Sequence, residues 1–314
     1  MNSIRLAKTH PSVFVVLFLF LFLSFTIPLT TARADGSSAP TFSLSTGILN
    51  QYIFRGVANS DSSAVIEPSF TASWEGFSAN VWGNVDTSRN SDNPFLPMPS
   101  FETGNAKWSE TDVTFSYTKN LTQNFSVLIG NVYYGVERPL QSPYGTNEDE
   151  VFGGVSYNFP WFTAAFTTYG EVMNTVDEWF ELDLSKSIPL PMLNCVCKGT
   201  TLNLGTSFGY LILNHTNNLL ALNGSTGSYS GPQTCLLDAT VAFPVNKYLT
   251  LAPTIGLWLP LTSAAANYLE ANSLDEKATH FYGGHKHDRY VLITANNGGC
   301  LIKRTGPLIP ARRG

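Results

Sequence analysis

Apolar and polar side chains alternate along most of the chain between Thr41 and Gly284. Runs of about ten residues follow this pattern, and the breaks between them are alternately short and long. Successive side chains of a β-strand point to opposite faces, so each run separates its apolar residues from its polar residues. A wall between lipid and a wet lumen needs that arrangement. The pattern therefore predicts an all-β fold, a transmembrane antiparallel β-barrel.

The clearest runs keep Asp, Glu, Ser or Asn at their polar positions. They are residues 112–118, 180–185, 202–210 and 237–243. The alternative is a soluble β-sandwich, which would bury the apolar face against a second sheet. A sandwich would rarely keep acids and amides so consistently on the other face. The pattern favours the barrel.

Twelve strands are predicted, an even number, as in single-chain bacterial barrels. They lie near residues 42–54, 64–74, 77–86, 111–119, 125–135, 151–159, 161–171, 178–186, 201–211, 235–244, 248–259 and 277–284. Short periplasmic turns that alternate with longer outer loops place the N-terminus on the periplasmic side. The connection at 189–200 is longer than this rhythm predicts.

The start of the chain predicts export. An apolar stretch from Val13 to Leu29 follows basic residues, and Ala32-Arg33-Ala34 suits cleavage before Asp35. The stretch is long for a signal peptide, so an uncleaved inner-membrane anchor is the alternative. We expect three regions: a signal peptide at 1–34, an outer-membrane β-barrel at 35–284 and an atypical basic tail at 285–314.

The charge distribution narrows the choice of partners. Charged residues make up 13% of the chain, against about a quarter in ordinary soluble domains. Residues 35–284 hold 22 acidic and nine basic residues, whereas 285–314 hold one acidic and six basic residues. An acidic body argues against nucleic acid as a partner. We expect outer-membrane lipid and small hydrophilic solutes instead, with the barrel assembly machinery as a partner during insertion.

The segment Ser45–Ser60, with its core Tyr52-Ile53-Phe54-Arg55-Gly56, resembles the opening of the TorF-like putative porins. Similar pieces occur at 74–77, 152–157 and 281–284. The resemblance implies an outer-membrane barrel of channel function in a Gram-negative bacterium, and it brings no catalytic residue. The last strand of that family normally continues in alternation and ends near an aromatic residue. Here the sequence becomes basic after Gly284, which indicates either a shifted reading frame near the gene's end or a genuine periplasmic extension.

Candidate lumen residues occupy the polar positions of their strands. Arg55 lies where the first strand meets its outer loop. If it projects inward, it faces a set of acids: Glu67, Asp86, Asp112, Glu181, Asp183 and Asp238. Such a row sets charge selectivity, because a narrow wet lumen in low-dielectric walls focuses the field. The alternative is that Arg55 pairs with one or two of these acids and ties the barrel together.

Aromatic residues gather near the strand ends, where they favour a girdle at the membrane interface over ordinary packing. They are Tyr52, Phe54, Trp74, Phe77, Tyr133, Tyr134, Trp161, Phe162, Trp179 and Phe180.

Cysteine and histidine give no sign of a metal site or an enzyme. Cys195 and Cys197 lie in a predicted periplasmic turn and Cys235 at the outer end of a strand, too far for a bridge. Four-ligand metal spacing is missing. Only His215 and His280 lie near the body to serve as the base of a hydrolase. We expect no catalysis, metal or cofactor.

These observations predict a channel for passive diffusion of small hydrophilic solutes, with a preference for cations. One alternative is a non-conducting barrel that presents its outer loops for adhesion or binding. Another is an outer-membrane barrel hydrolase.

Overall fold

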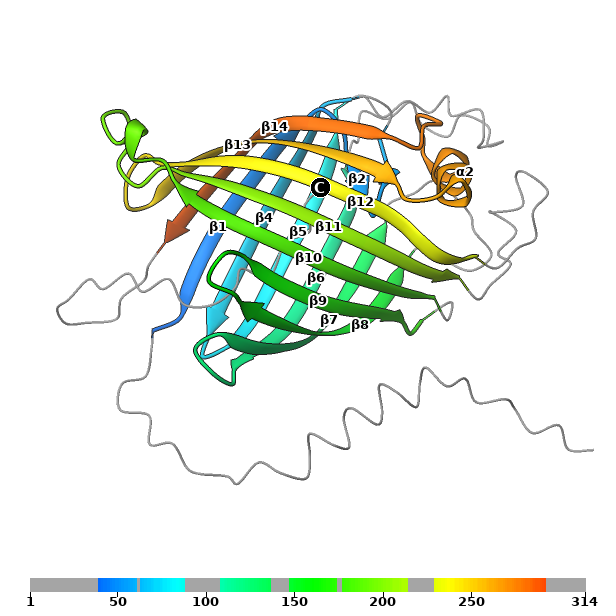
Figure 1. Cartoon of the computed structure of the whole chain (residues 1–314), viewed down its shortest axis with the longest axis horizontal. Coiled ribbons are helices and arrows are strands. Elements are labelled where there is room, and N and C mark those ends of the chain that lie inside the picture. Colours follow the sequence, from blue (N-terminus) through cyan, green and yellow to red (C-terminus); the bar gives the residue numbers. More distant parts are fainter. Residues whose placement is uncertain are drawn as a thin grey trace, which may run out of the picture. The chain divides into compact units, whose positions relative to one another are not determined.

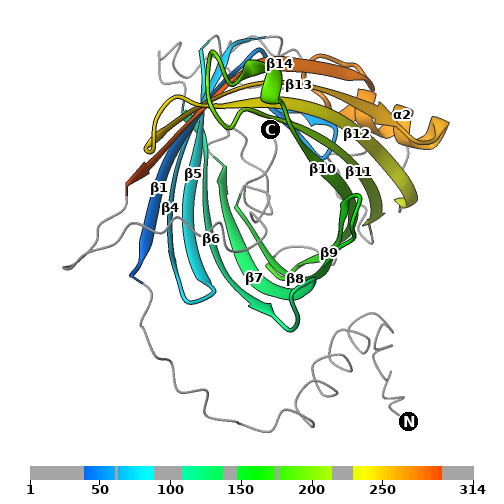
Figure 2. The same cartoon turned by 60° about the vertical axis from the view of Figure 1, so that its left-hand side comes forward.

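The computed structural model describes residues 39–60, 63–87, 108–136, 147–173, 177–213 and 229–291, the last seven as backbone only. Within this part of the chain, twelve antiparallel strands form a closed barrel (Figure 1). They are β1 (Thr41–Leu49), β4 (Val65–Trp74), β5 (Phe77–Asp86), β6 (Trp108–Asn120), β7 (Phe125–Val136), β8 (Glu148–Asn158), β9 (Thr163–Glu171), β10 (Glu178–Pro189), β11 (Thr201–Leu213), β12 (Tyr229–Pro244), β13 (Leu249–Pro260) and β14 (His280–Val291). Each strand pairs with the next one in this order, and β14 pairs with β1 (Figure 2).

The twelve predicted strands are confirmed, although the ends of several differ from those expected. The first strand was expected to reach residue 54, but β1 ends at Leu49. The chain then forms a hairpin of β2 (Ile53–Phe54) and β3 (Val57–Ala58). Arg55 and Gly56 at its tip have φ angles of 50° and 85°, as a two-residue type I′ turn requires.

The last strand is longer than expected. We placed the end of the barrel at Gly284, but β14 continues to Val291 and pairs on both sides, with β1 and with β13. Strand pairing uses backbone groups, so the change to basic side chains does not end it. The origin of 285–314 in a shifted frame stays a prediction. Residues 292–314 and the expected signal peptide lie outside the described residues.

The two ends of the barrel differ. One end carries the tight connections, for example the Glu75-Gly76 turn, whose φ angles are 48° and 90°. The long 189–200 connection is also there and contains the 3-10 turn η1 (Pro191–Leu193). The opposite end, called here the long-loop end, carries the hairpin and the helix α2 (Ser263–Asn272) (Figure 1). None of the helices described is both long and apolar enough to cross a membrane.

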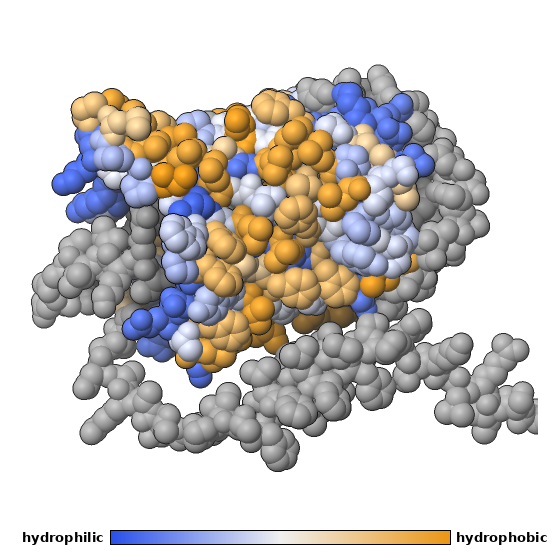
Figure 3. Space-filling view, in the orientation of Figure 1, coloured by the Kyte–Doolittle hydropathy of each residue, from blue (hydrophilic) through white to orange (hydrophobic). Residues whose placement is uncertain are grey.

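Large apolar side chains cover the outside of the barrel wall. Phe70, Phe115 and Phe281 on β4, β6 and β14 are 45%, 59% and 60% exposed. Figure 3 shows apolar residues across the middle of one face and hydrophilic ones toward both ends. The alternate positions of the same strands face inward. Many of these positions carry small polar residues, such as Ser69 and Ser116, which are buried.

The main buried cluster lies inside the long-loop end. It consists of Leu49, Tyr52, Ile53, Val65, Trp82, Leu236, Trp258 and Tyr282, with Phe54 packed against it. Tyr52 and Ile53 come from the hairpin region, whereas Trp258 and Tyr282 face inward from the wall. The hairpin therefore folds into the barrel and packs against its inner face.

Candidate functional site in the barrel lumen

The tip of the hairpin reaches the opposite wall of the barrel. The Nη1 and Nη2 atoms of Arg55 donate hydrogen bonds to Oε1 and Oε2 of Glu150 on β8, at 2.6 and 2.8 Å. The Tyr134 hydroxyl on β7 donates to Oε2 of the same carboxylate, at 2.7 Å. This two-pronged geometry is the strongest form of an ion pair between arginine and a carboxylate.

Three aromatic rings surround the same guanidinium. The Arg55 Cζ atom lies 4.8 Å from the ring centroids of Phe54 and Tyr169 and 5.1 Å from that of Trp179. All three distances are within the roughly 6 Å over which a cation and a ring attract each other. We call the group Phe54, Tyr134, Glu150, Tyr169 and Trp179 the Arg55 cage.

Glycines in neighbouring strands make room for the inward aromatic rings. The Trp179 indole lies against Gly209 on β11, where a Cβ atom would overlap the ring. Phe152 lies in the same way against Gly130 and packs on Tyr169 with 5.4 Å between ring centroids. The cage rings on β9 and β10 are therefore held by the wall itself.

All six predicted acids lie on inward-facing positions. They are Glu67 on β4, Asp86 on β5, Asp112 on β6, Glu181 and Asp183 on β10, and Asp238 on β12. Asp86 accepts a hydrogen bond from the Ser63 hydroxyl at 2.5 Å, and Asp183 accepts one from Ser207. Glu181 adjoins the cage, because its Oε2 accepts from the Trp179 indole at 3.0 Å.

The ion-pair partner of Arg55, Glu150, was not among the predicted acids. The predicted strand began at 151, so Glu150 was counted as loop, although it continues the inward set of Phe152 and Ser156. Glu110 was missed for the same reason, since β6 begins three residues earlier than predicted. Its Oε2 accepts from the Tyr52 hydroxyl at 3.0 Å.

Among the Lys and Arg residues whose side chains the structure describes, Arg55 is the sole one that is largely buried. Its side chain is 17% exposed. Five other lysines with described side chains are exposed: Lys119, Lys186, Lys198, Lys247 and Lys277. Among the described side chains, the interior is therefore rich in carboxylates and poor in basic groups.

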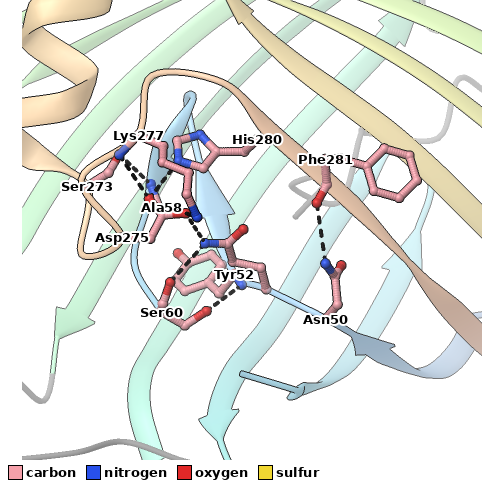
Figure 4. Close-up of polar contacts among 10 residues, drawn as sticks. Asn50, Tyr52, Ala58, Ser60, Ser273, Asp275, Lys277, His280 and Phe281 are labelled. Atoms are coloured by element: carbon pink, nitrogen blue, oxygen red, sulfur yellow. Dashed lines mark hydrogen bonds and ion pairs between the residues drawn. The ribbon is translucent and has the colours of Figure 1, made fainter. Parts of the chain in front are cut away.

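A second polar cluster fastens the hairpin to the loop that precedes β14 (Figure 4). Asp275 accepts from Gln51 and pairs with His280, both at 2.9 Å, and Lys277 lies 3.5 Å away. Burial alone would raise the pKa of the Asp275 carboxyl. The hydrogen bonds from Gln51 and His280 and the nearby positive charges outweigh burial, so this pKa is lowered.

Backbone contacts complete this attachment. The Leu274 N–H donates to the Ala58 carbonyl at 2.9 Å, and the Ala58 N–H donates to the Ser273 hydroxyl at 3.1 Å. Asn50 bonds β14 through both its side chain and its backbone, at the Phe281 and Gly283 peptide groups. The hairpin is thus held at its base by residues from the end of the barrel sequence.

The aromatic residues predicted for a girdle divide into two groups. Tyr52, Tyr134 and Trp179 are each 2% exposed and lie inside, where they build the core and the cage. Those on the outside include Trp74 and Trp161, at 48% and 77% exposed. For the inner group, the alternative of ordinary packing was the correct one.

Among the described side chains, three cysteines and His280 do not assemble a reactive site. Cys195, Cys197 and Cys235 are unpaired. The His280 Nε2 atom meets Asp275, and its Nδ1 atom has no hydrogen-bond partner in the described part of the chain. No group of three or more metal-ligating side chains occurs among the residues described. His215 and Cys300 lie outside them.

The sequence matches one known protein family. A family described as "Bacterial protein of unknown function (Gcw_chp)" matches residues 33–199, more than half of the chain. The chain belongs to the Gcw_chp family. The match includes the segment Ser45–Ser60. No curated protein matches this Gcw_chp sequence significantly.

Several solved structures are similar to this Gcw_chp barrel. The KdgM porin has 10% identity and a TM-score of 0.44, over 78% of this chain and 97% of that one. The NanC porin has 8% identity and a TM-score of 0.45, over 80% and 100%. The COG4313 outer membrane channel from Pseudomonas putida F1 has 9% identity and a TM-score of 0.44, over 85% and 100%.

Proposed function

We propose that this Gcw_chp protein is a TorF-like outer-membrane channel through which small hydrophilic solutes diffuse passively, with a preference for cations. The observation that carries the proposal is the closed barrel itself, apolar outside and rich in carboxylates inside.

The outer surface supports insertion in a membrane. A spanning strand needs about 9–11 residues when tilted, and the barrel strands have 9 to 16. An exposed apolar surface of this extent would be unfavourable in water. Aromatic pairs at the end with the tight turns, such as Phe77 with Tyr117 at 4.6 Å, suit a membrane interface.

The inner surface supports cation preference. Carboxylates line several strands, and Arg55 is neutralised by Glu150. A low-dielectric wall strengthens the field of the remaining acids. Cations would therefore be concentrated in the lumen and anions excluded.

The proposed channel activity can be tested by planar-bilayer recording. The full chain is purified from outer membranes in its folded form. We expect single-channel conductance. In a salt gradient, we expect a reversal potential whose sign shows that cations permeate more readily than anions. Asp183→Asn and Asp238→Asn together should reduce the ratio of cation to anion permeability, whereas Lys119→Gln at an exposed position should leave it unchanged. Anion selectivity of the unaltered protein would contradict the preference.

A second candidate is a non-conducting barrel that presents its long loops for adhesion or binding. The packing of the hairpin inside the long-loop end favours it, because Ile53 and Ala58 are fully enclosed there. Folded protein that carries no current at any voltage would support this candidate over the channel.

A further inference from the structure

Most of the side chains that surround Arg55 belong to the barrel wall and not to the hairpin. Tyr134, Glu150, Tyr169 and Trp179 come from four consecutive wall strands, and Phe54 alone belongs to the hairpin. The wall residues supply a carboxylate for the edge of a guanidinium and ring faces for its plane. This is the chemistry that recognises a planar organic cation.

The wall part of the cage is held by contacts that do not involve Arg55. The Tyr134 hydroxyl holds the Glu150 carboxylate at 2.7 Å, and the Trp179 indole is anchored to Glu181 and packed against Gly209. Tyr169 rests on Phe152. A site that is already ordered loses little entropy when a ligand enters. Withdrawal of Arg55 would therefore leave a formed receptor.

The charges around the cage also fit a cation. Glu150 belongs to the cage, Glu181 accepts from the Trp179 indole at 3.0 Å, and Asp183 lies two residues further along the same face of β10. Among the Lys and Arg side chains that the structure describes, Arg55 alone is largely buried, so its withdrawal leaves Glu150 without its two-pronged partner.

We propose that the Arg55 cage is a binding site for solutes that carry a guanidinium group, with Arg55 as an internal ligand that the solute displaces. The proposal rests on the proposed channel function, because the solute must reach the cage through the aqueous lumen. Displacement would also free the tip of the hairpin from the wall.

Ethylguanidinium is the probe, and the full chain with Arg55→Gly is the receptor. Glycine suits the positive φ of 50° at this position and removes the internal ligand. We expect saturable binding by calorimetry, with a change in tryptophan fluorescence, at least tenfold tighter than in the unaltered protein. Arg55→Asn, which also tolerates positive φ, should behave in the same way and guards against a folding defect of one variant.

Two controls identify the site. Arg55→Gly combined with Glu150→Gln should weaken binding at least tenfold, because the two-pronged partner has lost its charge. Ethylammonium should bind more weakly than ethylguanidinium to the single variant, because an ammonium cannot match a carboxylate with a planar pair of donors. Folded Arg55→Gly and Arg55→Asn proteins that both fail to bind ethylguanidinium would overturn the proposal. Equal binding after Glu150→Gln would do the same.

Bilayer recording separates this result from the fate of the channel. If the unaltered protein conducts and the Arg55→Gly protein does not bind the probe, the cage proposal fails and the channel stands. If the variant binds the probe and neither protein conducts, the channel fails and the cage remains a binding site. If both hold, ethylguanidinium should block the current of Arg55→Gly at concentrations that leave the unaltered protein open.

Discussion

Arg55 and Glu150 are 95 residues apart in the sequence, yet their side chains form a two-pronged ion pair at 2.6 and 2.8 Å inside the barrel. The pair joins a short hairpin to the wall that faces it. The Arg55–Glu150 pair therefore fixes the tip of the hairpin to the barrel wall.

Glu150→Gln removes the counter-charge of Arg55 and keeps the shape of the side chain. We expect the free energy of unfolding to fall by about 3 kcal/mol, the lower end of the range for one partner of a buried pair, because Arg55 keeps some solvent contact. Urea unfolding in lipid measures it. Adding Arg55→Asn should recover part of the loss, and strict additivity of the two changes would contradict the coupling.

Gly56→Ala tests how closely the tip of the hairpin packs against β12. Gly56 has a φ of 85°, and a Cβ atom there would lie 2.5 Å from Cγ2 of Thr234. We expect the strain, on the order of 1–3 kcal/mol, to unseat the tip and to lower hydrogen-exchange protection at residues 53–58 without change in the barrel strands. Gly170→Ala is the control, since nothing lies within 4 Å of its Cβ position. Equal protection in both variants would show that the tip does not depend on this contact.

Two adjacent glycines of β14 test the pairing of β14 with β1, which closes the barrel. A Cβ atom on Gly284 would overlap the Ile48 carbonyl oxygen, whereas the nearest atom to one on Gly283 is 3.6 Å away. We expect Gly284→Ala to weaken closure, since each backbone group left unpaired in lipid costs several kcal/mol, and Gly283→Ala to be tolerated. The temperature at which the folded band is lost in gel electrophoresis reports the difference. If the Gly284→Ala barrel is as heat-resistant as the Gly283→Ala barrel, the close contact between Gly284 and Ile48 does not matter for closure.

Acid should loosen the attachment around Asp275. The folded pKa of this carboxyl is lowered, so its contribution to stability is fully present above the unfolded value of about 3.9 and is lost as the pH falls through the folded pKa. We expect hydrogen exchange in residues 273–280 to rise below about pH 4. Asp275→Asn should show faster exchange at neutral pH and no further acid step, and an acid step retained in that variant would assign the effect to another group.

The wall of the barrel could be predicted from the sequence because alternation is a local property. Phe115 and Asp112 reveal their faces through their neighbours in the same strand. The inward direction of Asp112, Glu181 and Asp183 was predicted for the same reason.

The hairpin and the partner of Arg55 could not be predicted in this way. Tyr52, Ile53 and Phe54 are consecutive apolar residues, which break the alternation, and Arg55-Gly56 suits a two-residue turn, so the sequence did contain a signal for a separate hairpin. Nothing local indicates which of the acids meets Arg55. That choice depends on how far the hairpin reaches across the lumen, which follows from the size of the closed barrel.

The contacts of Asn50 and Ala58 with Gly283 and Leu274 also determine an order of events during assembly. These partners are separated by more than two hundred residues, so the base of the hairpin lacks them until the last strand has arrived. A barrel built from its N-terminal strands onward would have the wall partners of Arg55 on β7–β10 before it has the partners of the hairpin base. Attachment of the hairpin base then coincides with closure of the wall, and a chain truncated before residue 273 could not complete either step.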